Sequence, residues 1–382
     1  MPSDTNRVEL AFYGEVTAGT VVTGTYFALP FTGTTDMGST PETVVSDVIR
    51  SDRQVTDLIK VNESISGSFD SELIPGDYLN NLMYAASQAD LSNLVTEAAL
   101  CSSVSVTVAG QTFTIGTGTY SATPSAGEWV EITSGAVTEY HRLTAATSTV
   151  LTIEGTTNLV TSTMTITRAG SAYNGTTKYP MTFKRTFTDA TIYEYLAGME
   201  VDTFSVTASS SSIVTYSLGL VGMNYQILTA PIASTSTGTF PTSGPFNASS
   251  NVATIGEGGT GLQVCTELTM EIANNLRERN VIGTTGAHSI GSGEFNVSGQ
   301  LSVYFEDETL IDKLRNNTTS SISFGFTDGN GAAIIFDMPA VKFTEGVPEV
   351  GGKNDDVMLN LGYQAFRDPT LGYTLRTSTF AA

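Results

Sequence analysis

Paired acidic residues are the side chains of this sequence whose spacing could support catalysis. Asp70 and Glu72 lie on one face of a predicted strand, and Glu267 and Glu271 lie on one face of another. Two carboxylates about 5–10 Å apart across a cleft could hydrolyse a glycosidic bond. These pairs instead share a polar strand face, which leaves two other interpretations open: a solvated face, or the acidic lining of a channel.

The other candidate sites lack the partners that catalysis or ion binding requires. His141 and His288 are the only histidines, and neither belongs to an ordered set of nucleophile, acid and base. The glycine-rich run at residues 256–262 lacks the lysine and the following helix of a phosphate loop, so a linker is expected there. Residues 328–331 resemble the start of a calcium loop, but no ligands follow, and a hairpin turn is expected. We expect no catalytic, cofactor or metal site.

The cysteines, the first residues and the lack of a long apolar run lead us to expect a protein that folds in the cytoplasm. Cys101 and Cys265 have no metal-ligand spacing and are too few for a disulfide framework, so reduced thiols are expected. Trp129 starts a predicted strand and is either a core residue or a carbohydrate platform. Residues 1–7 lack the basic and apolar segments of a signal peptide, and no apolar run reaches the ~18 residues of a membrane helix. No membrane partner is expected.

Composition and charge favour a β protein that does not hold nucleic acid. Charged residues make up 14% of the chain against a typical ~25%, and Gly, Ser and Thr take their place, as suits short strands and many turns. The net charge is −21, yet residues 101–178 are nearly neutral, so the acidity lies outside that segment. Lysine and arginine supply most non-specific affinity for nucleic acid, and an acidic chain should not bind it stably.

The sequence contains an internal repeat. Residues 65–73 form an alternating strand, and residues 297–305 repeat it in phase, each followed by an acidic turn and a helical segment. Further matches follow in the same order: Tyr78, Leu79 and Leu82 with Leu310, Ile311 and Leu314, residues 187–189 with 326–328, and residues 222–226 with 361–364. Their order and spacing indicate a duplicated folding unit. Two similar units in one chain suggest rings that contain fewer chains than units.

The repeat and the changes in residue composition along the chain predict three structural units. Residues 1–100 and 179–232 should form a discontinuous first unit, and residues 233–382 a second unit, of which 233–261 are a linker. Residues 101–178 read as an inserted all-β domain, because short strands alternate there with turn residues. Helices are expected at about residues 77–86, 90–99 and 307–316.

Motifs in both units resemble the tail tube proteins of long-tailed bacteriophages, in the version with two tube domains per chain. In the first unit they are residues 49–55 and 64–67. In the second unit they are residues 271–276, 297–299, 304–307, 337–339 with 341–343, and 364–369. The resemblance covers both units, about 1–100 and 179–382, and is looser in the insertion. The motifs are structural and identify no catalytic residue.

The resemblance implies a mainly β fold: two tandem β-sandwich or barrel-like units, each with one flanking α-helix, and a small all-β domain inserted in the first. One-domain tube proteins are implied to form six-fold rings, so two units per chain imply homotrimeric rings with pseudo-six-fold symmetry, stacked around a channel for the genome. The implied partners are further copies of the chain and the tape measure, tail terminator and distal tail proteins, while viral DNA passes without stable binding. The implied location is the virion tail, assembled in the host cytoplasm. The alternatives are a surface adhesin or carbohydrate-binding β protein and a glycan-degrading enzyme.

Two sets of residues are expected to serve such an assembly. Asp70, Glu72, Glu267 and Glu271 are the candidates for the channel lining. The loops before the repeated strand are expected to contact the neighbouring ring through Arg50, Arg53, Asp57, Arg277, Glu278 and Arg279, where arginine can pair with carboxylates. The insertion is expected to project from the outer surface, because pseudo-symmetry leaves it no equivalent place in the ring.

Overall fold

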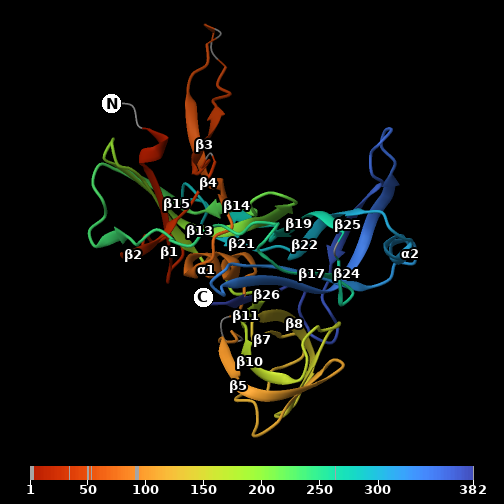
Figure 1. Cartoon of the computed structure of the whole chain (residues 1–382). Helices are drawn as coiled ribbons and strands as arrows, with labels where there is room; N and C mark the ends of the chain where they lie inside the picture. Colours follow the sequence, from red (N-terminus) through yellow and green to blue (C-terminus); the bar gives the residue numbers. More distant parts are fainter. Residues whose placement is uncertain are drawn as a thin grey trace.

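The computed structural model of the chain describes residues 4–33, 35–49, 51–52, 54–90, 94–262 and 264–381. The protein is mainly β, as the sequence predicts, and its described residues contain two α-helices (Figure 1). Two long hairpins extend from one side of the molecule, and a small barrel lies on the opposite side. Neither described helix has the length and apolar character that crossing a membrane would need.

We refer to residues 4–90 and 181–228 as the first half, to residues 98–168 as the barrel and to residues 252–381 as the second half. The first half contains the 3-10 helix η1 (Thr5–Arg7), β1 (Val8–Gly14), β2 (Gly24–Leu29), β3 (Gly38–Val45), β4 (Leu58–Glu72), α1 (Asp77–Ala86), β12 (Met181–Phe187), β13 (Ile192–Ser209), β14 (Thr215–Gly222) and β15 (Asn224–Leu228). The second half contains β17 (Val252–Glu257), β18 (Thr260–Gly261), β19 (Cys265–Ala273), β20 (Arg277–Arg279), β21 (Ser289–Gly291), β22 (Asn296–Tyr304), α2 (Thr309–Arg315), β23 (Ser320–Thr327), β24 (Ala333–Glu349), β25 (Met358–Ala365) and β26 (Arg376–Phe380). The connections carry β11 (Gly170–Tyr173) and β16 (Thr235–Thr237).

One antiparallel sheet, which we call the inner sheet, runs through both halves. Its strands follow the order β3–β4–β14–β13–β19–β22–β25–β24. The halves join where residues 203–209 of β13 pair with residues 267–273 of β19. Strand pairing therefore makes the two halves one continuous surface.

Each half covers the inner sheet with an outer sheet. The outer sheet of the first half is β2–β1–β12–β13–β15, and that of the second half is β18–β17–β23–β24–β26. The long strands β13 and β24 contribute to both layers. A single hydrophobic core lies between the layers and extends through both halves, with Phe69, Phe204 and Phe324 among its fully buried members.

The second half repeats the first half in register. Ile65 of β4 lies opposite Gly222 of β14, and Val297 of β22 lies opposite Ala365 of β25. The pairing of β13 with β14 shifts between Val201 and Thr203, and the pairing of β24 with β25 shifts at the matching place, between Phe343 and Glu345. Gly67 and Gly299 are also matched, because a Cβ at Gly67 would collide with the adjacent backbone at Met37, just before β3, and one at Gly299 with the backbone of Thr269 in β19. Since such bulges and close approaches are specific features of a sheet, the repeat is structural as well as sequential. The predicted match of residues 222–226 with 361–364 is out of register, because Gly222 corresponds to Ala365.

The barrel consists of six strands in the closed order β10–β5–β6–β9–β8–β7 and has its own core. Its strands are β5 (Ala98–Ala109), β6 (Thr112–Ile115), β7 (Trp129–Ser134), β8 (Val137–Ala146), β9 (Val150–Ile153) and β10 (Ser162–Arg168). Trp129 is buried, against Ala333, Ile335 and Phe380 of the second half. Ala333 and Ile335 alternate along β24 with Ile334 and Phe336, which face the main core. The barrel therefore packs on the outward face of an outer sheet.

The helix predictions are confirmed at two places and wrong at the third. Helix α1 has the predicted bounds, and α2 lies within its predicted range. The helix expected at residues 90–99 does not form in the described part of that range, where Ala98 and Ala99 already belong to β5 and pair with β10. Tertiary pairing overrides the helix propensity of the alanine- and leucine-rich run there. Within the predicted linker 233–261, β17 and β18 form a hairpin that pairs with β23.

Candidate assembly surfaces

The four acidic residues expected in the channel lie on one face of the inner sheet. Asp70 is opposite Ser217, which is opposite Ser205, which in turn is opposite Glu271. Glu72 and Glu267 follow these acids at even spacing along β4 and β19, and therefore share their face. We call this surface the polar face.

The polar face is rich in small hydroxyl side chains and open to solvent. Asp70, Glu267 and Glu271 are exposed, and Glu72 is half-buried. Serine and threonine occupy neighbouring positions of the same face on β13, β14, β19 and β22. Lys342 is a basic residue in the same cross-strand row, opposite Gln364. The other face of these strands forms the core, so burial alone decides which side faces outward.

The inner sheet ends in two edges on the described strands. At one edge β3 pairs with β4, and no other strand of the described chain pairs with it. At the other edge residues 345–349 of β24 pair with β25 alone within the described chain. By the matched bulges, residue 345 of β24 corresponds to Thr203 of β13, and residues 35–40, which lead into the start of β3, correspond to residues 268–273 of β19. The two edges are thus the counterparts of the two strands that join inside the chain.

Arg185 covers part of the β3 edge. The backbone of Asp36 faces β4, since its N–H donates to the Ser68 carbonyl at 3.0 Å, so the carbonyls of Thr35 and Met37 face the edge. The Arg185 guanidinium donates to these two carbonyls at 3.1 and 2.8 Å. Its Nε lies 2.6 Å from the buried Glu194 carboxylate, which also accepts a hydrogen bond from Tyr225. A fixed arginine therefore occupies acceptors that an added strand would use.

Each edge also carries a proline. At the β13–β19 junction the Asp202 carbonyl accepts the Asn274 N–H, and the N–H of Ser210, just after β13, donates to the Thr266 carbonyl. The backbone groups of the even-numbered residues between them therefore face β19. Pro348 on β24 corresponds to Val206, so its nitrogen faces the free edge of β24. Pro41 on β3 is odd-numbered like Thr35 and Met37, so its nitrogen faces the free edge of β3. Proline removes an edge donor without disturbing the ladder on its inner side, a common protection of free strand edges.

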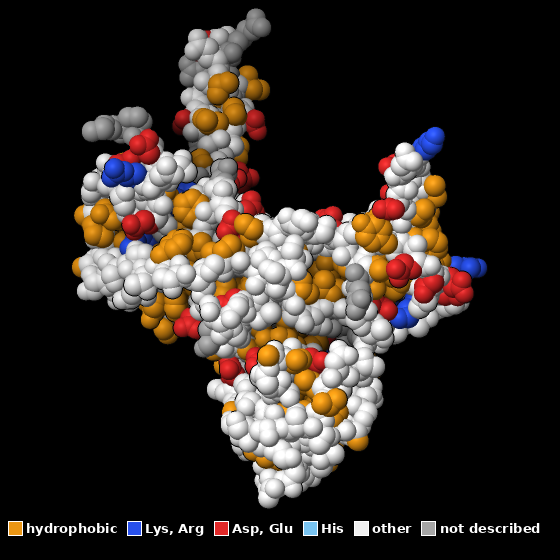
Figure 2. Space-filling view, viewed as in Figure 1, with side chains coloured by type: hydrophobic (Ala, Val, Ile, Leu, Met, Phe, Trp, Pro, Cys, Tyr) orange, Lys and Arg blue, Asp and Glu red, His pale blue; other side chains and the backbone are white. Residues whose placement is uncertain are grey.

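The two hairpins that extend from the molecule expose apolar side chains among polar and charged ones. On the β3–β4 hairpin Val48, Ile49 and Val55 are exposed, Ile49 to 97%, and on the β24–β25 hairpin Val347 and Val350 are exposed. Figure 2 shows hydrophobic side chains on both projections, while the barrel surface in that view carries few charges. Exposed apolar patches of this kind mark interaction surfaces.

The structure brings together the two loops that were expected to contact a neighbouring ring. Asp57 lies on the β3–β4 hairpin and is exposed, while Arg50 and Arg53 lie outside the described residues. Arg277, Glu278 and Arg279 form β20, which pairs with β21. The Glu278 carboxylate accepts a hydrogen bond from Ser64 at the base of the hairpin, at 2.6 Å. The two arginines of β20 remain exposed.

A buried ionic cluster, which linear sequence reasoning missed, holds the barrel to the second half. Arg142 of β8 lies 3.4 Å from Asp337 of β24 and 3.0 Å from Glu154. Asp337 is fully buried, and burial raises its pKa to about 6, opposed mainly by the charge of Arg142. The sequence did contain one sign of this cluster, because Asp337 interrupts the apolar run of residues 332–341. Its partner Arg142 belongs to a distant segment, so the pairing could not be predicted.

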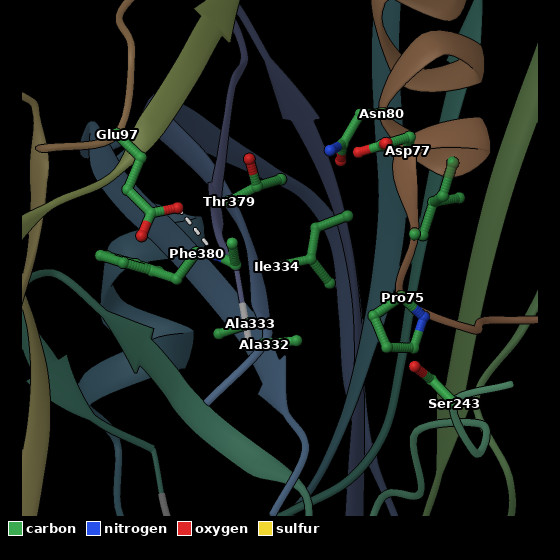
Figure 3. Close-up of a pocket in the computed structure, with 13 residues that line it drawn as sticks. Pro75, Asp77, Asn80, Glu97, Ser243, Ala332, Ala333, Ile334, Thr379 and Phe380 are labelled. Carbon is green, nitrogen blue, oxygen red and sulfur yellow. Dashed lines mark hydrogen bonds between the residues drawn. The ribbon is translucent and has the colours of Figure 1, made fainter. Parts of the chain in front are cut away.

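The described residues contain no arrangement typical of a catalytic or metal site. His141 lies 2.8 Å from Glu139, and burial lowers its pKa. No group of three or more described His, Cys, Asp or Glu side chains could hold a metal ion. A pocket of about 260 Å³ lies where α1, β24 and β26 meet (Figure 3), with Asp77 and Glu97 on opposite walls. Glu97 accepts a hydrogen bond from the Ala381 N–H at 2.7 Å, so it serves packing there.

Comparisons with known proteins identify the family of the chain. A search of curated proteins found no significant match. The model of a family described as phage tail tube protein matches residues 5–365, which include both halves and the barrel. The chain belongs to the phage tail tube protein family and is a structural component of a phage tail.

Proposed function

We propose that three copies of this tail tube protein close into a ring by repeating, between chains, the junction that joins the halves within one chain. The β13–β19 junction is the observation that carries this proposal. The inner sheet of the second half ends in β24 as that of the first half ends in β13, and the inner sheet of the first half begins with β3 as that of the second half begins with β19. Strand β24 of one chain therefore fits β3 of the next, which continues the inner sheet around the ring.

The correspondence of the two halves specifies the register of the new junction. Thr207 lies opposite Thr269 inside the chain, and the matching positions place Glu349 opposite Asp36 of the next chain. Val347 falls opposite Gly38 by the same rule. Arg185 has to release or share the edge carbonyls, and the two prolines remove donors, so this junction should be weaker than the internal one. A weaker junction would keep free subunits from associating before assembly.

The number of chains follows from symmetry. Each chain supplies two equivalent positions, and a closed ring of three chains has six. The polar face would then line the channel, since the barrel occupies the outward face of the outer sheet on the other side of the core. An acidic, hydroxyl-rich wall repels the phosphate backbone weakly and offers no cationic anchor, as DNA passage requires. Asp70, Glu72, Glu267 and Glu271 are the proposed lining.

The apolar hairpins would join one ring to the next. Both extend from the same side of the molecule (Figure 1) and prolong strands of the inner sheet, β3–β4 and β24–β25, so they would leave the channel wall along the sheet toward a neighbouring ring. Burial of apolar side chains there would supply binding energy, and Arg50, Arg53, Asp57, Arg277, Glu278 and Arg279 are the proposed polar contacts at the same joint.

A disulfide experiment tests ring closure. Directly opposed residues that do not exchange hydrogen bonds have Cα atoms about 4.5 Å apart, within the range of a disulfide. The variant Asp36→Cys/Glu349→Cys should give covalent trimers on oxidation, and mass photometry of wild-type rings should find three chains. The pair Gly38→Cys/Glu349→Cys, two residues out of register, serves as the matched control and should cross-link poorly. Rings of six chains, or equal cross-linking of both pairs, would contradict the proposal.

A further inference from the structure

An open pocket lies beside α2 in the second half. It measures about 370 Å³ and is lined by Leu262, Val264, Phe305, Leu310 and Leu359, with Lys313 at its rim. Phe305 is 37% exposed, and no residue of α2 is buried. In the first half six residues of α1 are buried, and Leu73, the counterpart of Phe305, is 0% exposed. The two halves therefore differ in what covers the helix.

Phe246 closes the corresponding place in the first half. Its N–H donates to the Leu73 carbonyl at 2.9 Å, and its carbonyl accepts the Val214 N–H at 2.9 Å. Leu73 and Val214 form a matched pair with Phe305 and Val357, because the Leu73 N–H donates to Val214 at 2.8 Å and the Phe305 N–H donates to Val357 at 3.0 Å. Phe246 is fully buried and belongs to the core.

The segment that carries Phe246 leads into β17, the first strand of the second half. Strand β17 pairs with β23 as β1 pairs with β12: Val252 lies opposite Phe326, and Val8 lies opposite Phe187. The residue before each strand is also matched, since Asn251 accepts the Thr327 N–H at 2.7 Å and Arg7 accepts the Thr188 N–H at 3.0 Å. The segment before β1 is therefore the counterpart of the segment that contains Phe246.

We propose that the pocket beside α2 receives the segment preceding β1 of the next chain in the ring. Inside one chain, the segment before β17 carries Phe246 into the first half. Between chains, the segment before β1 of the next chain should enter the second half of this chain in the same way. This inference rests on the proposed ring and adds a second contact to it, distant from the β24–β3 junction.

The side chains fit this exchange. Counting back from β1 in the register of β17 places Pro2 at the position of Phe246. The pocket beside α2 is lined by a larger side chain, because Phe305 occupies the position that Leu73 has in the first half. The inserted residue is correspondingly smaller, with Pro2 in place of Phe246. Proline has no N–H for the Phe305 carbonyl, so the expected backbone contact is its own carbonyl with the Val357 N–H.

A photo-crosslinking experiment tests this contact in assembled rings. The variant Leu310→p-benzoylphenylalanine should cross-link to a peptide from residues 1–7, and mixing ¹⁴N- and ¹⁵N-labelled protein should show that the two peptides come from different chains. The matched variant Tyr78→p-benzoylphenylalanine, at the corresponding position of α1, should give only links within one chain. Deletion of residues 1–4 should raise the concentration needed for ring formation by about tenfold or more, as the loss of one interface contact would.

The outcomes separate this inference from the ring itself. Rings of three chains that form normally without residues 1–4, or in which Leu310→p-benzoylphenylalanine links to another segment, would overturn the pocket assignment and leave the ring intact. Failure of the wild-type chain to form three-chain rings would overturn both.

Discussion

Replacement of Arg142 by methionine should destabilise the docked barrel in a pH-dependent way. Asp337 is fully buried, and the Arg142 Nε lies 3.4 Å from its carboxylate. Burial raises the pKa of Asp337 to about 6, above the value near 4 expected in the unfolded chain. The stability that Asp337 contributes is therefore complete below about pH 4 and is lost as the pH rises through about 6.

The size of the effect follows from the pKa. At about pH 8 the carboxylate is ionised in the folded protein, and protonating it would cost about 1.4 kcal/mol per pH unit, or about 3 kcal/mol in all. Without Arg142, Asp337 can bind this proton and so avoid an unpaired buried charge. The decrease in the free energy of unfolding that is due to Asp337 should therefore reach at most about 3 kcal/mol. At about pH 5 Asp337 is already largely protonated, and this part should vanish. The lost pair with Glu154, which is 30% exposed, should cost little at either pH.

Urea unfolding followed by tryptophan fluorescence measures this difference. Trp129 is the only tryptophan and is 3% exposed, in the contact between the barrel and the second half, so its emission reports undocking. Arg142→Met should lose clearly more stability at about pH 8 than at about pH 5. In an Asp337→Asn background the same substitution should lose its pH dependence. An equal loss at both pH values, or a pH dependence that persists in the Asp337→Asn background, would refute the reasoning.

The remaining predictions concern assembly. Glu349→Gln should strengthen ring closure at low salt and matter less at high salt, because like charges opposed across strands cost about 0.2–1 kcal/mol and are screened; sedimentation across salt concentrations measures this. Arg185→Met combined with Glu194→Gln should speed ring formation in light scattering by clearing the β3 edge, and slower assembly of a folded variant would show that the arginine supports the edge instead. Lysine at all four acidic positions of the polar face should leave tubes intact by electron microscopy but slow DNA ejection, most at low salt; unchanged ejection would remove these residues from the lining. Arg50→Ala with Arg277→Ala should give folded rings that stack poorly, and normal tubes would count against these contacts.

The residue pattern alone predicted the mainly β character, the repeated strand with its buried face and the duplication, but not the long strands β13 and β24, which belong to both layers. Alternation at residues 65–73 identifies the side that the structure buries, because the side-chain period of a strand does not depend on its partners. The same local rule placed α1 correctly. It failed at residues 98–99, where the preference of the run for helix was outweighed by pairing with β10.

Only the tertiary structure decided which strands pair and which strand edges remain unpaired. Register between distant strands depends on backbone pairing, which places residues 203–209 beside residues 267–273 and leaves β3 and β24 as edges. Arg142 reaches Asp337, and Arg185 reaches the edge carbonyls of β3, through contacts between segments far apart in the chain. Local patterns determine the face that a side chain occupies. Its neighbours are determined by the folding of the whole chain, because burial and pairing are properties of the assembled layers.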